Sequence, residues 1–286
     1  MRLFDFSEIE NSEAAVRKTW GEYRNALATK KFDFDDVDAA KRETFLKTYN
    51  DLFNNHKGIE FQTKLIESIV DIPVGRGTRL KETETPDYER FIPKKEYISE
   101  DNRFSPSGVE WLYLAAGGGS TRVECAKAEC RIKKGERFGF CDFKFSNLFL
   151  NQKIVDLTIA DDISYKEINS ELEQHGQNQY KRSLKIAKKM GLNVHIDERA
   201  FKEAMTKWGV YTYSKLLSQQ IFIPLAEGVD KSIEYAPFQS LAQYFISLGY
   251  SGIMYGSTVF PQGKNLVLFD KKMAAPVGDV VISVVE

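Results

Sequence analysis

The first seventy residues carry apolar side chains at helical spacing. In the first predicted helix these positions are Val16, Trp20, Tyr23 and Leu27. They recur every three or four residues and so share one face, with Ser12 as the candidate N-cap. A second helical pattern ends at the stop signals of residues 56–58, and a third, shorter one covers residues 59–70. We therefore predict an N-terminal helical module over residues 1–72.

A change of pattern at Asp71-Ile72-Pro73 marks the start of a second region, over residues 73–286. Glycine, proline and β-branched residues become frequent there, and alternation replaces the helical period. The predicted strands cover residues 77–81, 111–114, 137–145, 253–257, 265–269 and 280–285. The predicted helices cover residues 120–130, 164–190, 197–219 and 237–248. This mixture predicts an α+β fold, a twisted and mostly antiparallel sheet system surrounded by helices. The apolar strand 280–285 is expected to pair inside the sheet, because exposed edges aggregate.

Composition narrows the classes of function. Lys+Arg 40 nearly cancels Asp+Glu 41, which excludes a protein that wraps a polyanion by bulk charge, so no direct nucleic-acid partner is expected. The sequence has no apolar run of about 18 residues, so we expect no membrane span. The N-terminus also lacks the pattern of a signal peptide, which favours a cytoplasmic protein.

The cysteine and histidine content argues against a metal site. The three cysteines are Cys125, Cys130 and Cys141, and no two of them form a C-x-x-C pair. His56, His175 and His195 lie far apart along the chain. We interpret the cysteines as small buried residues and expect no bound metal.

Several well-known catalytic patterns are absent from the sequence. It has no G-x-G-x-x-G after a strand, no Walker A motif, no H-E-x-x-H and no G-x-S-x-G. The run Gly117-Gly118-Gly119-Ser120 resembles a phosphate-binding turn, but no lysine follows at P-loop spacing, which favours a simple turn into a helix. A metal-dependent nuclease would need acids such as Asp156, Asp161 and Asp162, which we interpret as capping residues instead.

Three blocks of sequence in order resemble the RES domain family, the toxin component of many Xre–RES toxin–antitoxin pairs. The first block runs from Asn102-Arg103-Phe104 to the Trp111-Leu112-Tyr113-Leu114-Ala115 strand. The second is residues 126–131 with Gly135, and the third comprises residues 235–243, 249–257 and 265–269. Together they span the chain from about residue 74 to residue 270. The N-terminal module and a helical insertion at about residues 160–215 lie outside the family pattern.

The resemblance implies a fold related to ADP-ribosyltransferases and a set of site residues. The family's glutamate matches Glu129, its serine Ser257 and its second arginine Arg103. Its first arginine matches either Arg76 or Arg79, because the tyrosine that usually precedes it is missing here.

Two further positions depart from the family pattern or compete within it. Glu124 competes with Glu129 for the glutamate, and we prefer Glu129 for its spacing to Arg131 and Gly135. Gln243 stands where the family often has a glutamate, and we interpret it as structural.

The resemblance further implies that NAD is the substrate, cleaved at its nicotinamide–ribose bond with no metal cofactor. In this interpretation Glu129 stabilises an oxocarbenium-like ribose and arginines hold the diphosphate. Ser257 would orient the nicotinamide or ribose, and Tyr113 or Tyr255 would stack on the ring. The acceptor is water, phosphate or a protein, which corresponds to an NAD glycohydrolase, an NAD phosphorylase or an ADP-ribosyltransferase. The family also implies a bacterial growth-arresting toxin with an antitoxin or regulatory protein as partner. The alternative is a non-catalytic, RES-like protein-binding module that uses the N-terminal helices.

Overall fold

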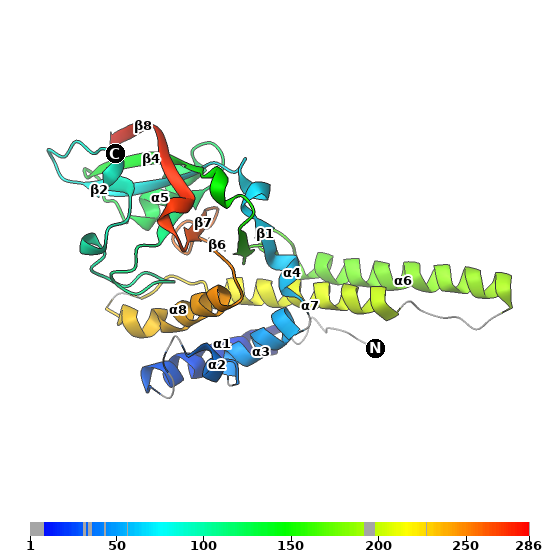
Figure 1. Cartoon of the computed structure of the whole chain (residues 1–286). Helices are drawn as coiled ribbons and strands as arrows, with labels where there is room; N and C mark the ends of the chain where they lie inside the picture. Colours follow the sequence, from blue (N-terminus) through cyan, green and yellow to red (C-terminus); the bar gives the residue numbers. More distant parts are fainter. Residues whose placement is uncertain are drawn as a thin grey trace.

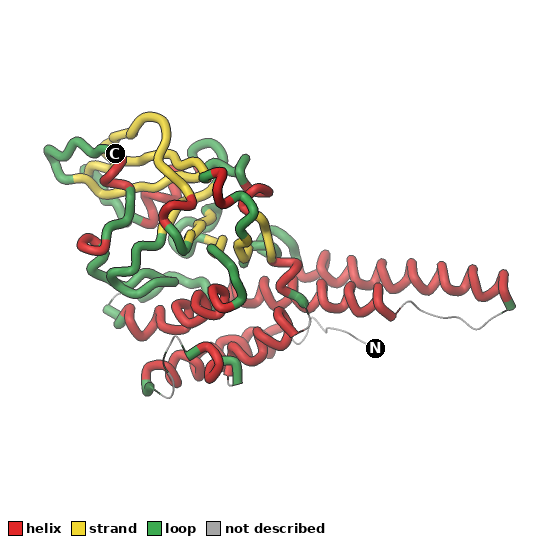
Figure 2. The backbone as a smooth tube through the Cα atoms, in the orientation of Figure 1, coloured by secondary structure: helices red, strands yellow, loops and turns green. Residues whose placement is uncertain are grey.

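One eight-stranded sheet forms the centre of the protein. The computed structural model describes residues 9–285 except 31–32, 34–35, 43, 56, 192–197 and 227. The strand order is β1-β5-β6-β7-β3-β2-β4-β8, and every pair is antiparallel except β5 with β6. The strands are β1 (Thr63–Leu65), β2 (Val74–Leu80), β3 (Leu112–Ala116), β4 (Arg137–Phe145), β5 (Lys153–Asp156), β6 (Gly252–Gly256), β7 (Lys264–Leu268) and β8 (Ala274–Val284). The predicted α+β class with a mostly antiparallel sheet is therefore confirmed (Figures 1 and 2).

The helices lie around this sheet and below it in the view of Figure 1. They are α1 (Ile9–Ala28), α2 (Val37–Ala40), α3 (Thr44–Tyr49), α4 (Ile59–Gln62), α5 (Thr121–Glu129), α6 (Tyr165–Met190), α7 (Glu198–Gln220) and α8 (Lys231–Ser247), with a π-helical turn at Asn50–Asn55. Among the helices described here, none is long and apolar enough to cross a membrane.

The segment 59–70 differs from the single helix predicted there. Helix α4 ends at Gln62, because Thr63 is extended and β1 pairs with residues 153–155 of β5. A short 3₁₀ turn, Ile66–Ile69, then buries two isoleucines in the sheet core. The apolar spacing that predicted a helix reflects these buried side chains, since sheet pairing overrides local helical preference.

The N-terminal helices share a core with the C-terminal ones. The Tyr23 hydroxyl donates to Ser240 Oγ of α8 at 2.5 Å, and Arg24 pairs with Glu234 at 2.8 Å. The Trp20 ring meets Phe45 and Phe238 edge-on, at centroid distances of 4.9 and 4.7 Å. Residues 1–72 thus supply β1 to the sheet and a packing surface to α8. The boundary at residue 72 remains a prediction.

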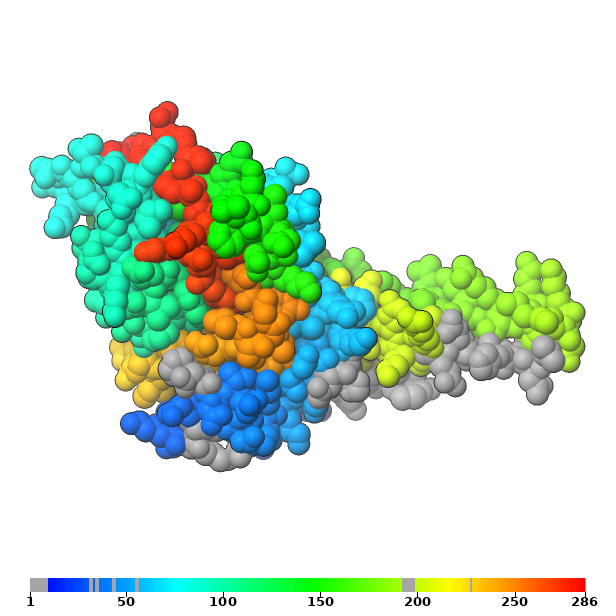
Figure 3. Space-filling model, in the orientation of Figure 1, coloured from blue at the N-terminus to red at the C-terminus, as the bar shows by residue number. Residues whose placement is uncertain are grey.

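Helices α6 and α7 form a long hairpin that projects from the body (Figures 1 and 3). Helix α6 starts with a capping box, in which Ser164 and Glu167 each accept a backbone hydrogen bond from the other residue. It ends at Gly191, whose φ of 64° is the left-handed conformation that glycine adopts without strain. The predicted helices 164–190 and 197–219 are therefore confirmed within about one residue at their described ends.

Strand β8 corrects the prediction for residues 280–285. It pairs with β4 on one side, but it is the last strand of the sheet and pairs with no described strand on its other side. Val281 and Val284 are 57% and 56% exposed. The apolar stretch at residues 280–285 predicted a strand correctly but carried no information on which strand would be outermost.

Two glycines of β2 allow phenylalanine rings of β4 to lie against the strand. A Cβ atom on Gly77 would sit 2.5 Å from the Phe138 ring, and one on Gly75 would sit 2.3 Å from the Phe140 ring. We expect Gly77→Ala to lower the free energy of unfolding by about 1–3 kcal/mol, the usual cost of overpacking. Gly21→Ala in α1, with no heavy atom of a described residue within 4 Å of the new Cβ, should raise it by about 0.5–1 kcal/mol. Urea denaturation midpoints measure both changes, and equal midpoints for the two variants would contradict the prediction.

Candidate active site

Glu129 is the last residue of α5, the helix that packs against β2 and β3. Its Oε1 atom accepts hydrogen bonds from Ser257 Oγ at 2.8 Å and from Asn265 Nδ2 at 2.5 Å. The residue is exposed, and it lines a cavity of about 710 Å³. Glu124, the competing glutamate, pairs instead with Lys127 at 2.9 Å and does not line that cavity.

Ser257 has its hydrogen-bonding capacity fully used. Its Oγ donates to Glu129 and accepts from the backbone N–H groups of Val259 and Phe260, at 3.3 and 3.0 Å. A hydroxyl has one proton and two lone pairs, so this pattern leaves no free position. The loop that supplies these amides is closed by a bond from Ser257 N to the Gly263 carbonyl at 2.9 Å. The hydroxyl proton is thereby directed at the carboxylate.

Arg76 and Arg79 both line the cavity but differ in their partners. Arg76 is partly buried on β2, and its Nη1 is a buried atom with no hydrogen-bond partner among the described residues. Desolvation by burial lowers the pKa of Arg76 to about 10, so the group remains a cation at neutral pH. Arg79 is half exposed, pairs with Glu136 at 3.2 Å and donates to the Arg131 carbonyl at 2.9 Å. Arg76 therefore has unused donors at the cavity, whereas Arg79 is already engaged.

Arg103 lies among aromatic rings. Its guanidinium carbon is 4.9 Å from the Phe238 centroid, 5.5 Å from Tyr235 and 5.9 Å from Phe222. Nη2 donates to Thr258 Oγ1 at 3.0 Å, while Nη1 is buried and has no hydrogen-bond partner in the described part of the chain. The rings hold the planar group by cation–π contacts and leave one donor for a ligand.

Tyr113 and Tyr255 also line the cavity, and both are held by protein contacts. The Tyr113 hydroxyl shares a hydrogen bond of 2.9 Å with Ser105, and the Tyr255 ring meets Phe104 edge-on at 4.9 Å. Burial raises the pKa of both phenols, so both remain protonated at neutral pH. Only 6% of Tyr255 is exposed, which leaves Tyr113 as the more accessible of the two rings.

The fold thus brings all seven predicted residues to one place. Arg76, Arg79, Arg103, Tyr113, Glu129 and Tyr255 line the same cavity, and Ser257 binds its carboxylate. Several other residues that line this cavity had no predicted role, among them Cys130, Tyr235, Thr258 and Asn265. Asn265 carried a usable signal, because it is a polar residue at the start of an otherwise apolar run. Tyr235 opens the third block of the family resemblance, but nothing in the sequence indicated that its ring would lie near Arg103. Thr258 carried no signal, since its role depends on where Arg103 lies.

The three acids considered for a nuclease have local partners. Asp156 Oδ1 accepts from the Thr158 amide and hydroxyl at 2.8 and 2.7 Å, and Asp162 pairs with Lys264 at 3.7 Å. Asp161 has a side-chain hydrogen bond with Ser218, although its Oδ1 has no hydrogen-bond partner in the described chain, and burial raises the pKa of this carboxyl group. Within the described residues no group of three or more histidines, cysteines and acids could hold a metal, and His56 and His195 lie outside those residues.

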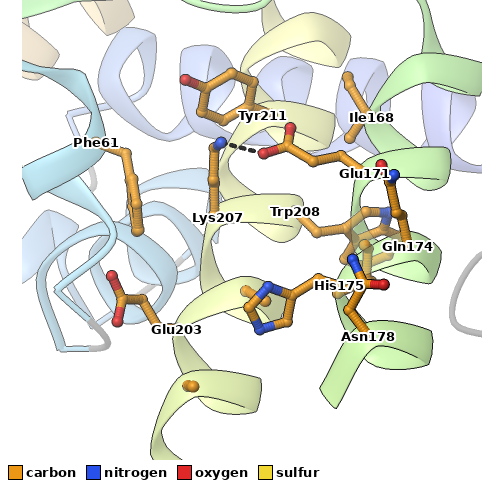
Figure 4. Close-up of a pocket in the computed structure, with 13 residues that line it drawn as sticks. Phe61, Ile168, Glu171, Gln174, His175, Asn178, Glu203, Lys207, Trp208 and Tyr211 are labelled. Carbon is orange, nitrogen blue, oxygen red and sulfur yellow. Dashed lines mark hydrogen bonds and ion pairs between the residues drawn. The ribbon is translucent and has the colours of Figure 1, made fainter. Parts of the chain in front are cut away.

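A second cavity, of about 420 Å³, lies between α6 and α7 near their bases (Figure 4). Phe61, Trp208 and Tyr211 give it an aromatic lining, and Lys207 pairs with Glu171 beside them. The Trp208 indole donates to Asn169 at 2.6 Å, which fixes the ring between the two helices. None of the predicted site residues lines this cavity.

Comparison with known proteins identifies part of the chain. Residues 198–283 match the family model of the RES domain, which confirms the resemblance predicted from sequence. No curated protein and no solved structure gives a match. The matched part holds Tyr255, Ser257 and Asn265, whereas Arg76, Arg103 and Glu129 lie before it. The match begins at Glu198, so α7 lies inside it although the sequence resemblance placed that helix in an insertion.

Proposed function

Residues 198–283 match the RES domain family model, and from that match we propose that the protein consumes NAD by breaking its nicotinamide–ribose bond. The observation that carries the proposal is a single cavity lined by the Glu129 carboxylate and by two arginines, each with a buried Nη1 that has no hydrogen-bond partner among the described residues. Two other carboxylates line this cavity, but Glu100 pairs with Lys231 and Asp101 accepts from the Ser107 amide. Burying an unpaired cationic donor is costly unless a ligand compensates for it. A twisted ADP-ribosyltransferase-like fold is part of the same proposal.

The arginines suit the diphosphate of a dinucleotide. Guanidinium groups bind phosphate oxygens through charge-assisted hydrogen bonds, and Arg76 and Arg103 each have an Nη1 with no hydrogen-bond partner among the described residues. In our proposal these two groups bind the diphosphate, whereas Arg79 keeps its ion pair with Glu136 and only lines the cavity. Tyr113 is the ring proposed to contact the nicotinamide or adenine.

Glu129 suits the nicotinamide–ribose end of NAD, where the bond breaks. In our proposal its Oε2 atom faces the ribose and stabilises the positive charge that develops as nicotinamide leaves, an interaction stronger in the transition state than in the ground state. Nicotinamide departs as a neutral molecule, so no general acid is required, and no histidine is among the described residues that line the cavity. The saturated hydrogen bonds of Ser257 support a role on the carboxylate, in place of the substrate contact suggested by the family resemblance.

The family context extends the proposal to a growth-arresting bacterial toxin that an antitoxin or regulatory protein restrains. The alternative, a non-catalytic binding module, would use the N-terminal helices as its docking surface. Those helices direct Tyr23 and Phe45 into the shared core, which leaves less of their surface for docking and gives the alternative less support.

The test is to incubate the purified protein with NAD and to measure free nicotinamide. Products then identify the acceptor: ADP-ribose for water, ADP-ribose 1″-phosphate for phosphate, and a modified polypeptide for a protein side chain. We expect catalytic release of nicotinamide by the wild type. A folded protein that binds NAD but leaves it intact would overturn the proposal and favour the binding module.

Cys130 offers a binding test that needs no turnover. It lines the cavity and is partly exposed, whereas Cys125 and Cys141 are buried. Burial raises the pKa of the Cys130 thiol to about 11, and the thiolate is the reactive form. We therefore expect slow alkylation by iodoacetamide at pH 8, a rate that rises with pH, and protection of this cysteine by ADP-ribose. Mass spectrometry of the labelled peptides measures all three, and labelling at Cys130 that ADP-ribose does not slow would contradict binding in this cavity.

A further inference from the structure

Asn265 is a buried amide in the middle of the sheet. It lies on β7 between Ala115 of β3 and Tyr255 of β6, and only 5% of it is exposed. The residues that follow it on the strand are apolar. A buried amide in such surroundings is destabilising unless both its donor and its acceptor are bonded.

Both ends of this amide have partners. Nδ2 donates to Glu129 Oε1 at 2.5 Å, and Oδ1 accepts from the Cys125 thiol at 3.6 Å. The opposite orientation would bring the amide oxygen against the carboxylate. The hydrogen bond from the thiol therefore stabilises the one orientation in which the amide N–H faces Glu129.

The thiol keeps its proton over the physiological range. Burial, with a smaller contribution from the charge of Glu129, raises the pKa of Cys125 to about 12. A Cβ atom on Gly263 would lie only 2.5 Å from Cys125 Sγ, so the glycine lets the loop after Ser257 approach the thiol closely. The thiol of this α5 residue is thus a constant donor packed against the loop.

The geometry points to Asn265 as a positioning residue for Glu129, oriented in turn by Cys125. We infer that two neutral donors, Ser257 and Asn265, hold Oε1 and leave Oε2 for the substrate. Glu129 is exposed at the end of a helix, where a free side chain would sample several rotamers. This inference rests on the proposed function, because the carboxylate needs a fixed position only if it acts on a bound ribose.

The experiment compares Asn265→Leu, Cys125→Ala and Cys125→Ser in nicotinamide release. Asn265→Leu has no donor, and we expect kcat to fall at least about tenfold while KM for NAD changes less than about threefold. Cys125→Ala removes the thiol donor, and we expect a smaller fall in kcat that Cys125→Ser, which keeps a donor, largely restores. Cys141→Ala, a buried thiol on β4 away from the cavity, is the matched control and should leave kcat unchanged.

The outcomes separate this inference from the proposed function. If the wild type releases nicotinamide and a folded Asn265→Leu variant keeps its kcat, the positioning role is wrong and the function stands. Equal losses of kcat in Cys125→Ala and Cys125→Ser would overturn the orienting role of the thiol. If the wild type is inactive, the proposed function fails, and a crystal structure of Asn265→Leu then decides. An unmoved Glu129 side chain would overturn the inference, and a displaced one would support it.

Discussion

Glu129→Gln is expected to slow nicotinamide release by at least about a hundredfold, which corresponds to about 2.7 kcal/mol of lost transition-state stabilisation. Glutamine preserves the shape of the side chain and can still accept a hydrogen bond from Ser257. It carries no negative charge to oppose the cation that develops on the ribose, so kcat should fall much more than KM rises. Steady-state kinetics with NAD as the substrate measures the split. The circular dichroism spectrum should be unchanged, since Glu129 is exposed.

Glu124→Gln is the matched control for this variant. Glu124 lies on the same helix and is exposed, but its partner is Lys127 and it does not line the cavity. We expect its activity to equal that of the wild type. If Glu124→Gln is inactive and Glu129→Gln active, the glutamates are assigned in the wrong order. Full activity in both variants would show that neither carboxylate stabilises the positive charge on the ribose, which contradicts the proposed role of Glu129.

The sequence predicted most elements because their local signals agree with their tertiary environment. Strand β4 has the predicted bounds, since its imperfectly alternating phenylalanines lie on a strand that pairs with β2 on one side and β8 on the other. Segment 59–70 was mispredicted for two reasons. The i, i+3 spacing of Ile66 and Ile69 fits a 3₁₀ turn as well as an α-helix, and a three-residue strand is too short to show its own period of two. The outer position of β8 and the shared core of α1 and α8 depend on contacts between distant segments. Neither is encoded within a short window of sequence.

The residues of the candidate site likewise fall into those that the sequence predicted and those that only the structure identified. The family pattern brought Arg103, Glu129 and Ser257 into consideration, but left Arg76 and Arg79 equivalent. Only the structure distinguishes them, because burial and pairing are properties of the folded neighbourhood. No role was predicted for Asn265 or Cys125, because the amide acts through its contact with the Glu129 carboxylate and the thiol through its contact with the amide. Both contacts join segments that are distant in the sequence.

Arg76→Met is expected to weaken NAD binding while making the protein more stable. Methionine fills a similar volume without a charge, so the loss of a charge-assisted hydrogen bond should raise KM by about 10- to 100-fold. The same change removes a buried cationic donor that has no partner among the described residues, so the free energy of unfolding should rise by about 1 kcal/mol or more. Thermal denaturation and NAD kinetics on one preparation measure the two effects.

The pKa of Arg76 fixes how the stability gain should vary with pH. Folding lowers this pKa to about 10, so below pH 10 the group is charged in both states and the folded state carries the full cost of burying it. Above pH 10 the folded state binds fewer protons than the unfolded state, and the wild type recovers stability as pH rises. The advantage of Arg76→Met should therefore be largest at neutral pH and shrink above pH 10.

Arg79→Met tests whether this behaviour is specific to the buried arginine. Arg79 is half exposed and paired with Glu136, so its loss should change KM by less than about threefold and should not raise stability. A stabilised Arg79→Met variant, or an Arg76→Met variant with lowered stability and unchanged KM, would assign the diphosphate to the other arginine. We therefore expect NAD affinity to fall and stability to rise in Arg76→Met but not in Arg79→Met. A buried guanidinium that binds a phosphate destabilises the protein without ligand, because its donor is compensated only when the phosphate binds.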